Sequence, residues 1–154
     1  VQGLKGPFTC LNSARYGIAW GALGAAEDCW TRARQYVLDR QQFGRPLAAN
    51  QLIQKKLADM QSEIEAGKLL MWRAAWLAAQ KRDALREITQ AKLYTSEMYA
   101  RHANMGVQIM GGYGLHAEYD MQRYYRDARS ATIAAGTSQT QLNLIAGLMG
   151  LKAK

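Results

Sequence analysis

The chain has 154 residues and a formal net charge of +8, and hydrophobic residues make up 49% of it. A chain of this length can bury one hydrophobic core without disulfides or metals, so we expect a single domain over residues 1–154. Only two residues are proline, which excludes a proline-rich disordered chain and fits a compact helical protein. The positive charge indicates an anionic partner, but no run of five or more Lys and Arg occurs, so we expect no nucleic acid.

Two further features bear on the compartment. The uncharged run over residues 130–151 is long enough to cross a bilayer, yet Thr, Ser, Gln and Asn at its centre exclude a membrane helix. Cys10 and Cys29 fall within one predicted helix, about 28 Å apart and beyond the reach of a disulfide. We expect two buried free thiols, which are typical of a bacterial cytoplasm or a mitochondrial matrix.

The first predicted element is a long helix over residues 9–40. Apolar and small residues recur there at steps of three or four, the period of a helix with one buried side. The stripe consists of Leu11, Ala14, Ile18, Ala22, Ala25, Cys29, Ala33 and Tyr36. Gly17, Gly21 and Gly24 would let a neighbouring helix approach closely, so we expect this helix at the centre of the domain.

A second helix is predicted from Ala49 or Asn50 to about Arg82. Its main stripe consists of Ile53, Leu57, Met60, Ile64, Met71, Ala74 and Ala78. Trp72 and Trp76 are four residues apart and therefore share an adjoining face. Two apolar faces indicate that the helix is buried on two sides, one of which packs on the domain core and the other on a second surface that the sequence does not identify.

The remaining elements are a third long helix and two shorter segments. Asp83 is expected to cap a helix over residues 84–110. Its apolar stripe consists of Ile88, Ala91, Thr95, Met98, His102, Met105 and Ile109, and His102 is expected to be a hydrogen-bonded core residue. A short amphipathic segment over residues 117–129 follows an exposed His116. The last helix is expected to begin at Ser138, which forms a capping-box pattern with Gln141. The sum is an all-α fold, an antiparallel, up-and-down four-helix bundle.

Three segments between these helices have a composition that suits a ligand. The corner over residues 39–56 places four basic residues beside Phe43 and Gly44, although a plain helix–helix connection would look the same. Gln108 precedes a cluster of glycines, which either admit a ligand to the backbone or stop a helix. Residues 136–139 open a helix N-terminus, which favours a phosphate or carboxylate but is also an ordinary cap. None of the three decides the matter alone.

In combination and in order, these motifs resemble the C-terminal helical domain of the acyl-CoA dehydrogenases. The likeness covers essentially the whole chain, and its motifs are Arg40-x-x-Phe43-Gly44, Gln51, Gln108-x-x-Gly111-Gly112-x-Gly114, Arg126-Asp127-Ala128 and Gly136-Thr137-Ser138. Residues 3–60 are most similar to the glutaryl-CoA dehydrogenase branch, whereas the chain from about residue 63 onward resembles the short- and branched-chain members. This change indicates a divergent relative or a chimera of two parents.

The resemblance implies a cofactor, a substrate and a longer protein. Members of the family carry an N-terminal helical domain and a middle β-domain before this bundle, and neither is in the sequence, so we expect a piece of a longer protein. Members bind FAD between these domains and across a subunit interface, and they are usually tetramers. We therefore expect a homo-oligomer, a dimer or tetramer, with FAD and an acyl-CoA substrate in the full-length context.

Position by position, the resemblance assigns residues to this site. Six would meet the flavin nucleotide of a neighbouring subunit, namely Arg40, Gln42, Phe43, Leu47, Asn50 and Ile53. Gln108 and Gly112 would lie along its ADP portion, and Thr137 and Gln139 would bind FAD near the active site. Arg15 matches an arginine near the acyl-CoA substrate. No metal site is expected.

The catalytic base that the resemblance implies is missing. Most members use the glutamate of a Tyr-Glu-Gly-Thr motif to remove the α-proton of the acyl-CoA, but this chain has Ala135 at that position. An isovaleryl-type branch places its base on the first helix, where this chain has Ala14. Alanine has no titratable group, and a positioned general base typically contributes about 10²–10⁴-fold to a rate.

Two hypotheses follow, and a third is weaker. The first is a C-terminal domain that contributes FAD binding and oligomerisation to the α,β-dehydrogenation of a glutaryl-CoA-like thioester and is inactive alone. The alternative is a non-catalytic helical module, natural or engineered, that retains the fold without the chemistry. The third, a basic bundle that binds nucleic acid, predicts steeply salt-dependent binding.

Overall fold

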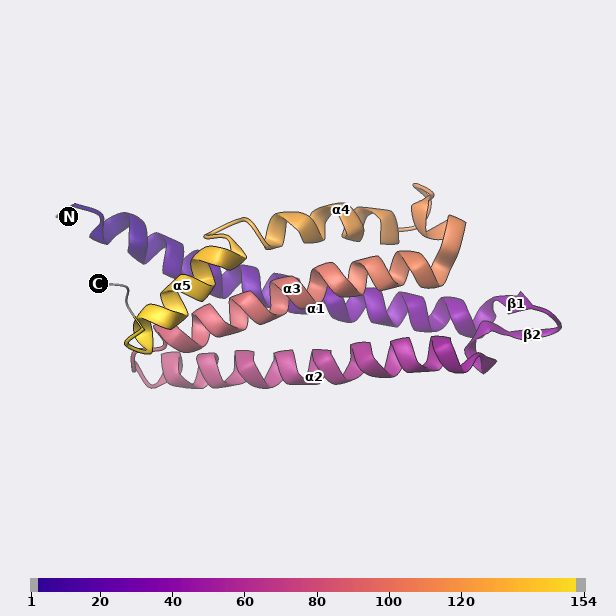
Figure 1. Cartoon of the computed structure of the whole chain (residues 1–154), viewed down its shortest axis with the longest axis horizontal. Coiled ribbons are helices and arrows are strands. Elements are labelled where there is room, and N and C mark those ends of the chain that lie inside the picture. Colours follow the sequence, from indigo (N-terminus) through magenta and orange to yellow (C-terminus); the bar gives the residue numbers. More distant parts are fainter. Residues whose placement is uncertain (1–2, 152–154) are drawn as a thin grey trace.

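The computed structural model describes residues 3–151. Three long helices, α1 (Lys5–Asp39), α2 (Gln51–Ala79) and α3 (Leu85–Met110), run up and down beside one another (Figure 1). The shorter helix α4 (Met121–Ala131) returns along α3, and α5 (Ser138–Leu148) packs on α3 near its beginning. The predicted all-α bundle is therefore confirmed.

The central helix is α3, not α1 as the sequence predicts. Helix α3 contacts each of the other four helices, and half of its residues are buried. In α1, a side chain added at Gly17, Gly21 or Gly24 would meet no atom within 4 Å, so these glycines face open space. Within residues 3–151, no helix makes the expected close approach to that side of α1.

The buried face of α1 also differs from the predicted stripe. Ala14 and Leu11 are exposed, and the buried residues are Arg15, Ala19, Ala22, Leu23, Ala26, Cys29, Ala33 and Val37. The physical reason is that Ala and Gly occur all around this helix, so the apolar period does not distinguish one side from another. Helices α2 and α3 carry larger side chains, and their predicted stripes match the buried faces more closely.

Methionine side chains fill much of the core between the long helices. Met60, Met71, Met98 and Met121 are each at most 1% exposed. Burying a side chain of this size contributes about 1.5–3 kcal/mol, and its flexibility allows it to fill irregular gaps. At Gly106 a Cβ would lie 2.4 Å from the sulfur of Met121, so the glycine lets α4 pack closely on α3.

Side-chain caps fix where the helices begin. The side chain of Asn50 accepts a hydrogen bond from the Leu52 amide at 3.0 Å, and Asp83 does the same for Leu85 at 3.0 Å. Helix α5 begins at Ser138 as predicted, but its cap is Thr137, whose side chain accepts from the Thr140 amide at 3.3 Å. The expected capping box is therefore wrong by one residue, because Thr and Ser stand side by side and both can cap.

A β-hairpin that was not predicted from the sequence joins α1 to α2. Strand β1 (Gln41–Gln42) pairs antiparallel with β2 (Arg45–Pro46), and a 3-10 helix η1 (Leu47–Ala49) leads into α2. Phe43 and Gly44 at the tip have φ values of +52° and +77°, the left-handed pair that a two-residue type I′ turn requires. The ring of Phe43 is consequently 100% exposed.

Three expectations about single residues have mixed outcomes. His102 is fully buried and its Nε2 lies 3.1 Å from Glu63, which confirms a hydrogen-bonded core histidine. Cys29 is buried as expected, but Cys10 is exposed. The reason is that the first turns of α1 extend beyond the rest of the bundle (Figure 1).

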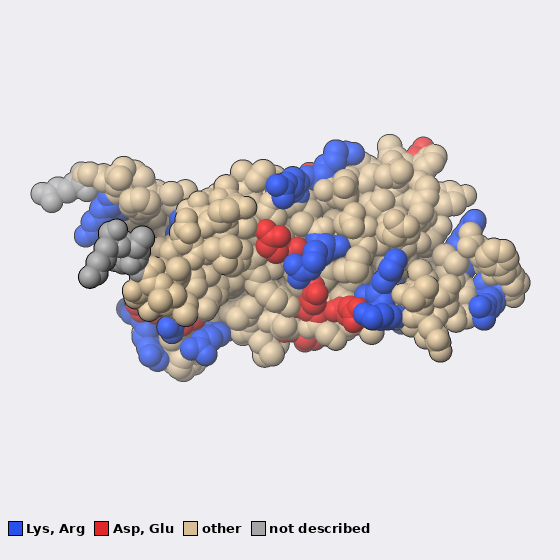
Figure 2. Space-filling view, viewed as in Figure 1, with Lys and Arg blue, Asp and Glu red and all other residues tan. Residues whose placement is uncertain are grey.

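The surface shows the scattered charge that the sequence indicates. On the face shown in Figure 2, Lys and Arg form several separate groups, and Asp and Glu lie between some of them. No helix within residues 3–151 combines the length and the apolar character needed to span a membrane.

Candidate functional site

A cavity of about 510 Å³ lies where the end of α1, the beginning of α2 and the end of α3 meet. Seven of the ten residues that the resemblance assigns to FAD line it, although they come from segments far apart in the sequence. These seven are Arg40, Gln42, Leu47, Asn50, Ile53, Gln108 and Gly112. The antiparallel arrangement of the three long helices places their ends together and so creates the cavity.

The cavity combines one positive charge with several amide groups. Within residues 3–151, no carboxylate oxygen lies within 4.0 Å of the Arg40 guanidinium, so its charge is uncompensated by an ion pair. The side chains of Gln42, Asn50 and Gln108 supply hydrogen-bond donors and acceptors. This donor set suits an anionic ligand that also carries polar groups, such as a nucleotide.

The glycine turn after α3 (3-10 helix η2, Gly111–Leu115) borders this cavity. Gly111 has φ +61° and ends α3, whereas Gly112 has open space where a Cβ would stand. At Gly114 a Cβ would lie 2.9 Å from both the Cα and the carbonyl oxygen of Val107. One glycine therefore stops the helix, one leaves the backbone accessible from the cavity, and one allows the turn to pack against α3.

A second group of predicted residues lies around the loop before α5. The Nε of Arg15 donates to the Ala135 carbonyl at 3.0 Å, and the Lys92 ammonium donates to the Gly136 carbonyl at 2.9 Å. The Gln141 amide also donates to the Gly136 carbonyl, at 3.0 Å. Three side chains from three helices therefore hold the carbonyls of two successive residues.

This loop has a strained backbone and a buried positive charge behind it. Ala135 has φ +54°, in the left-handed region that costs a non-glycine residue about 1–2 kcal/mol. Lys92 is fully buried, and burial together with the neighbouring Arg15 charge lowers its pKa. Gln141 is also fully buried, and its Oε1 has no partner in the described part of the chain.

Lys92 and Gln141 are site residues that sequence reasoning missed. The signal for Lys92 was its position within the apolar stripe, directly after Ala91 and three residues before Thr95, where a solvated lysine is not expected. Glu97 was also missed, and its carboxylate accepts a hydrogen bond from the Ser138 hydroxyl. The hydrogen bonds of Lys92 and Glu97 could not be predicted from the sequence, because the donor and the acceptor of each bond lie more than 40 residues apart.

The resemblance predicts a catalytic base at the position of Ala135 or of Ala14. Ala135 is in the loop itself, and Ala14 is the chain neighbour of Arg15, which bonds the Ala135 carbonyl at 3.0 Å. Neither alanine can accept a proton. The loop therefore has no carboxylate at position 135, and Ala14 supplies none on α1.

The ends of α1 and α3 that border the cavity lie well away from the loop before α5 (Figure 1). Arg15 and Arg40 are both on or next to α1, and 25 residues of helix separate them by about 37 Å. Arg15, Thr137 and Gln139 are consequently absent from the cavity, and Phe43 belongs to neither group because it stands at the exposed hairpin tip. One chain does not unite all the predicted residues in one site.

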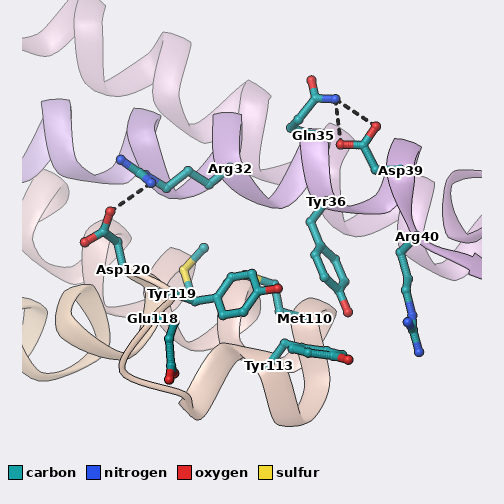
Figure 3. A pocket seen from close by; sticks show the side chains of 11 residues that line it. Arg32, Gln35, Tyr36, Asp39, Arg40, Met110, Tyr113, Glu118, Tyr119 and Asp120 are labelled. Carbon is teal, nitrogen blue, oxygen red and sulfur yellow. Dashed lines mark hydrogen bonds and ion pairs between the residues drawn. The ribbon is translucent and has the colours of Figure 1, made fainter.

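A second cavity, of about 520 Å³, adjoins the first (Figure 3). The two cavities share Tyr36, Arg40, Met110 and Tyr113 as lining residues. Its far side holds the Arg32–Asp120 ion pair, with a distance of 2.8 Å. None of the tyrosines around it was singled out from the sequence as a site residue.

Comparison with known proteins identifies this architecture. Residues 2–149 match the family described as acyl-CoA dehydrogenase, C-terminal domain. The chain belongs to this family.

Relatives within the family carry several different names. The chain is 42% identical over 146 residues to the human mitochondrial short-chain specific acyl-CoA dehydrogenase, covering 95% of this chain and 35% of the relative. It is 39% identical over 148 residues to the caffeyl-CoA reductase-Etf complex subunit CarC of Acetobacterium woodii, covering 96% of this chain and 39% of that subunit. The chain thus spans well under half the length of the acyl-CoA dehydrogenase relatives it matches.

A solved acyl-CoA dehydrogenase relative shares the fold closely. The glutaryl-CoA dehydrogenase from Mycobacterium smegmatis in complex with FADH2 superimposes with a TM-score of 0.95 at 33% identity. The match covers 100% of this chain and 40% of that one.

Proposed function

We propose that this chain contributes FAD binding and an oligomer interface to the α,β-dehydrogenation of an acyl-CoA thioester by a longer acyl-CoA dehydrogenase-like flavoprotein. The observation that carries the proposal is the cavity lined by Arg40 and six more of the residues that the resemblance assigns to FAD. Within residues 3–151, Arg40 has no ion-pair partner. A relative of the same fold is described in complex with FADH2, which supports the cofactor.

The residues of the cavity fit the ADP half of this cofactor. The Arg40 guanidinium would hold the diphosphate, and the amides of Gln42, Asn50 and Gln108 would bond its polar groups. Gly112 would leave room for the ligand against the backbone, since no atom lies within 4 Å of the place of its absent Cβ. Bound FAD would supply the acceptor for the hydride that leaves the acyl β-carbon.

The two groups of site residues would serve two different FAD molecules. The separation of about 37 Å along α1 favours an arrangement in which the Arg40 cavity holds the FAD of a neighbouring subunit. Thr137, Gln139 and Arg15 would then face the FAD and acyl-CoA of their own subunit. A complete site requires at least two copies of the chain in this arrangement.

Exposed apolar side chains support an oligomer. On α2, Trp72 and Trp76 are 58% and 55% exposed. Near the end of the chain, Leu142 and Met149 are 55% and 62% exposed. Large apolar residues gathered on the surface are typical of an interface with another protein or domain.

The nucleotide contact can be tested with the chain itself. ADP would be titrated into the 17.2 kDa chain and followed by NMR chemical shifts, with Arg40→Gln compared to Arg45→Gln in the adjoining hairpin as the matched control. Loss of a hydrogen bond to a charged group costs about 1.5–3 kcal/mol, or roughly tenfold or more in the dissociation constant. Equal weakening by the two variants would contradict the assignment of Arg40, and inorganic phosphate alone separates nucleotide binding from a general affinity for anions.

The missing catalytic base provides a test between two hypotheses, an acyl-CoA dehydrogenase domain and a non-catalytic helical module. The paired alanines at positions 134 and 135 favour the second, because the loop is fully built but has no proton acceptor. We would compare Ala135→Glu with Ala135→Gln in the full-length context, using FAD and glutaryl-CoA or a short-chain acyl-CoA. The proposal predicts a rate about 10²–10⁴ higher for Glu than for Gln, and equal inactivity of the two would favour the module without chemistry.

A further inference from the structure

Tyr113 stands in the wall between the two adjoining cavities, and its ring faces Arg40. The guanidinium carbon of Arg40 lies 5.5 Å from the centre of the Tyr113 ring, within the range of a cation–π contact. Figure 3 shows both side chains at the end of α1 and in the turn after α3. Tyr113 is partly exposed and lines both cavities, whereas Arg40 carries the charge that would meet the ligand.

The ring is itself held in place by neighbours. Tyr119 meets it edge to face, with ring centres 5.5 Å apart, and Tyr36 lies 6.3 Å away on the side of α1. Below it, Gly114 is packed against α3 so closely that a Cβ would lie 2.9 Å from the Val107 backbone. The platform under Arg40 is therefore fixed by other side chains and by the turn.

A neutral aromatic platform has an advantage over an acidic partner at this position. A carboxylate would fix Arg40 too, but it would occupy the N–H groups and cancel the charge that a phosphate must meet. A ring contacts the flat face of the guanidinium and leaves its N–H edges free. Ordering the arginine before binding also removes part of the entropy cost of binding.

From these contacts we infer that Tyr113 is a positioning residue that holds Arg40 ready for the diphosphate of the nucleotide. The inference deepens the proposed function and depends on it, since Arg40 must be a ligand contact for Tyr113 to act through it. It also assigns a role to a residue that the glycine-rich motif does not include, because Tyr113 is the unspecified position between Gly112 and Gly114.

The test compares Tyr113→Phe, Tyr113→Leu and the control Tyr125→Leu, which removes a tyrosine that is 50% exposed on α4 and lines neither cavity. The first readout needs no ligand. A ring below Arg40 shifts the NMR signals of its side chain upfield, and this shift is expected in the unaltered chain, in Tyr113→Phe and in Tyr125→Leu but not in Tyr113→Leu. The second readout is the dissociation constant for ADP in each variant and in an Arg40→Gln background.

We expect Tyr113→Leu to weaken ADP binding about two- to fivefold, the strength of an exposed cation–π contact, with no loss in Tyr113→Phe. In the Arg40→Gln background, Tyr113→Leu should add no further loss. Three results would each overturn the positioning role. They are an unchanged dissociation constant for ADP in Tyr113→Leu, weaker ADP binding in Tyr113→Phe, and a further loss from Tyr113→Leu in the Arg40→Gln background. If the unaltered chain does not bind ADP, the proposed function itself fails, and the ring-induced shift alone then decides whether Tyr113 holds Arg40.

Discussion

The glycine turn after α3 gives a graded prediction, because its three glycines have three different environments. Gly112 has an ordinary φ and open space around its missing Cβ. Gly111 has open space but φ +61° and ψ −137°, a combination that is strained for other residues. Gly114 has an ordinary φ, but a Cβ would lie 2.9 Å from backbone atoms of Val107.

These differences fix the expected order of destabilisation on substitution by alanine. Gly112→Ala should change the free energy of unfolding by no more than about 0.5 kcal/mol. Gly111→Ala should cost about 1–3 kcal/mol through backbone strain. Gly114→Ala should cost about 1–3 kcal/mol through overpacking, since backbone atoms cannot rotate away as a flexible side chain can.

Urea unfolding followed by helical circular dichroism measures all three variants under one protocol. A change in the midpoint with an unchanged slope reports a change in stability. Titration of the same samples with ADP distinguishes an effect on stability from an effect on binding. The methyl group of Gly112→Ala would project toward the cavity and weaken ADP binding, while the free energy of unfolding stays constant. A Gly112→Ala variant as unstable as Gly114→Ala, or a neutral Gly114→Ala, would refute the reasoning.

Two further predictions concern buried titratable groups. Burial lowers the pKa of His102, and the Glu63 contact opposes the shift. The unfolded chain therefore binds the proton more readily than the folded chain. The free energy of unfolding should consequently fall on acidification below the ordinary histidine pKa of about 6.5. The melting temperature of the unaltered chain should therefore drop more between pH 7 and pH 5 than that of His102→Gln, and parallel curves would contradict this. A thiol reagent should label the exposed Cys10 at once but Cys29 only on unfolding, because Cys29 is fully buried and burial raises its pKa to about 12; rapid labelling of both would show that the core is open.

The fold could be predicted from the sequence where large side chains mark one face of a helix. Met60, Ile64 and Met71 of α2, and Met98 and Ile109 of α3, are buried at the predicted helical spacing. In α1 the same reasoning failed, because small residues on all sides leave the buried face to be decided by packing against α3. The assignment of α1 as the central helix was wrong for the same reason.

The candidate site was only partly accessible from the sequence. The motif residues at the ends of α1, α2 and α3 do share a cavity, but Phe43 is excluded from it by a turn in which a bulky residue adopts a positive φ, which its ordinary preference does not predict. Lys92 could not be assigned, because its partner is the carbonyl of Gly136, 44 residues away. Tyr113 acquires significance only when the folded chain places it under Arg40.

The most direct test of the account asks whether one FAD site is built from two copies of the chain. In the full-length context, Arg40→Gln and Gln139→Ala each place a defect in every site of a homo-oligomer. The two variants would carry different tags, be produced together and be purified as mixed oligomers. Where a copy of one variant meets a copy of the other, one FAD site has both defects and the other site has none. The account predicts that each pair formed by one copy of each variant recovers tight FAD binding at one of its two sites, and mixed oligomers that bind FAD no better than either variant alone would contradict it.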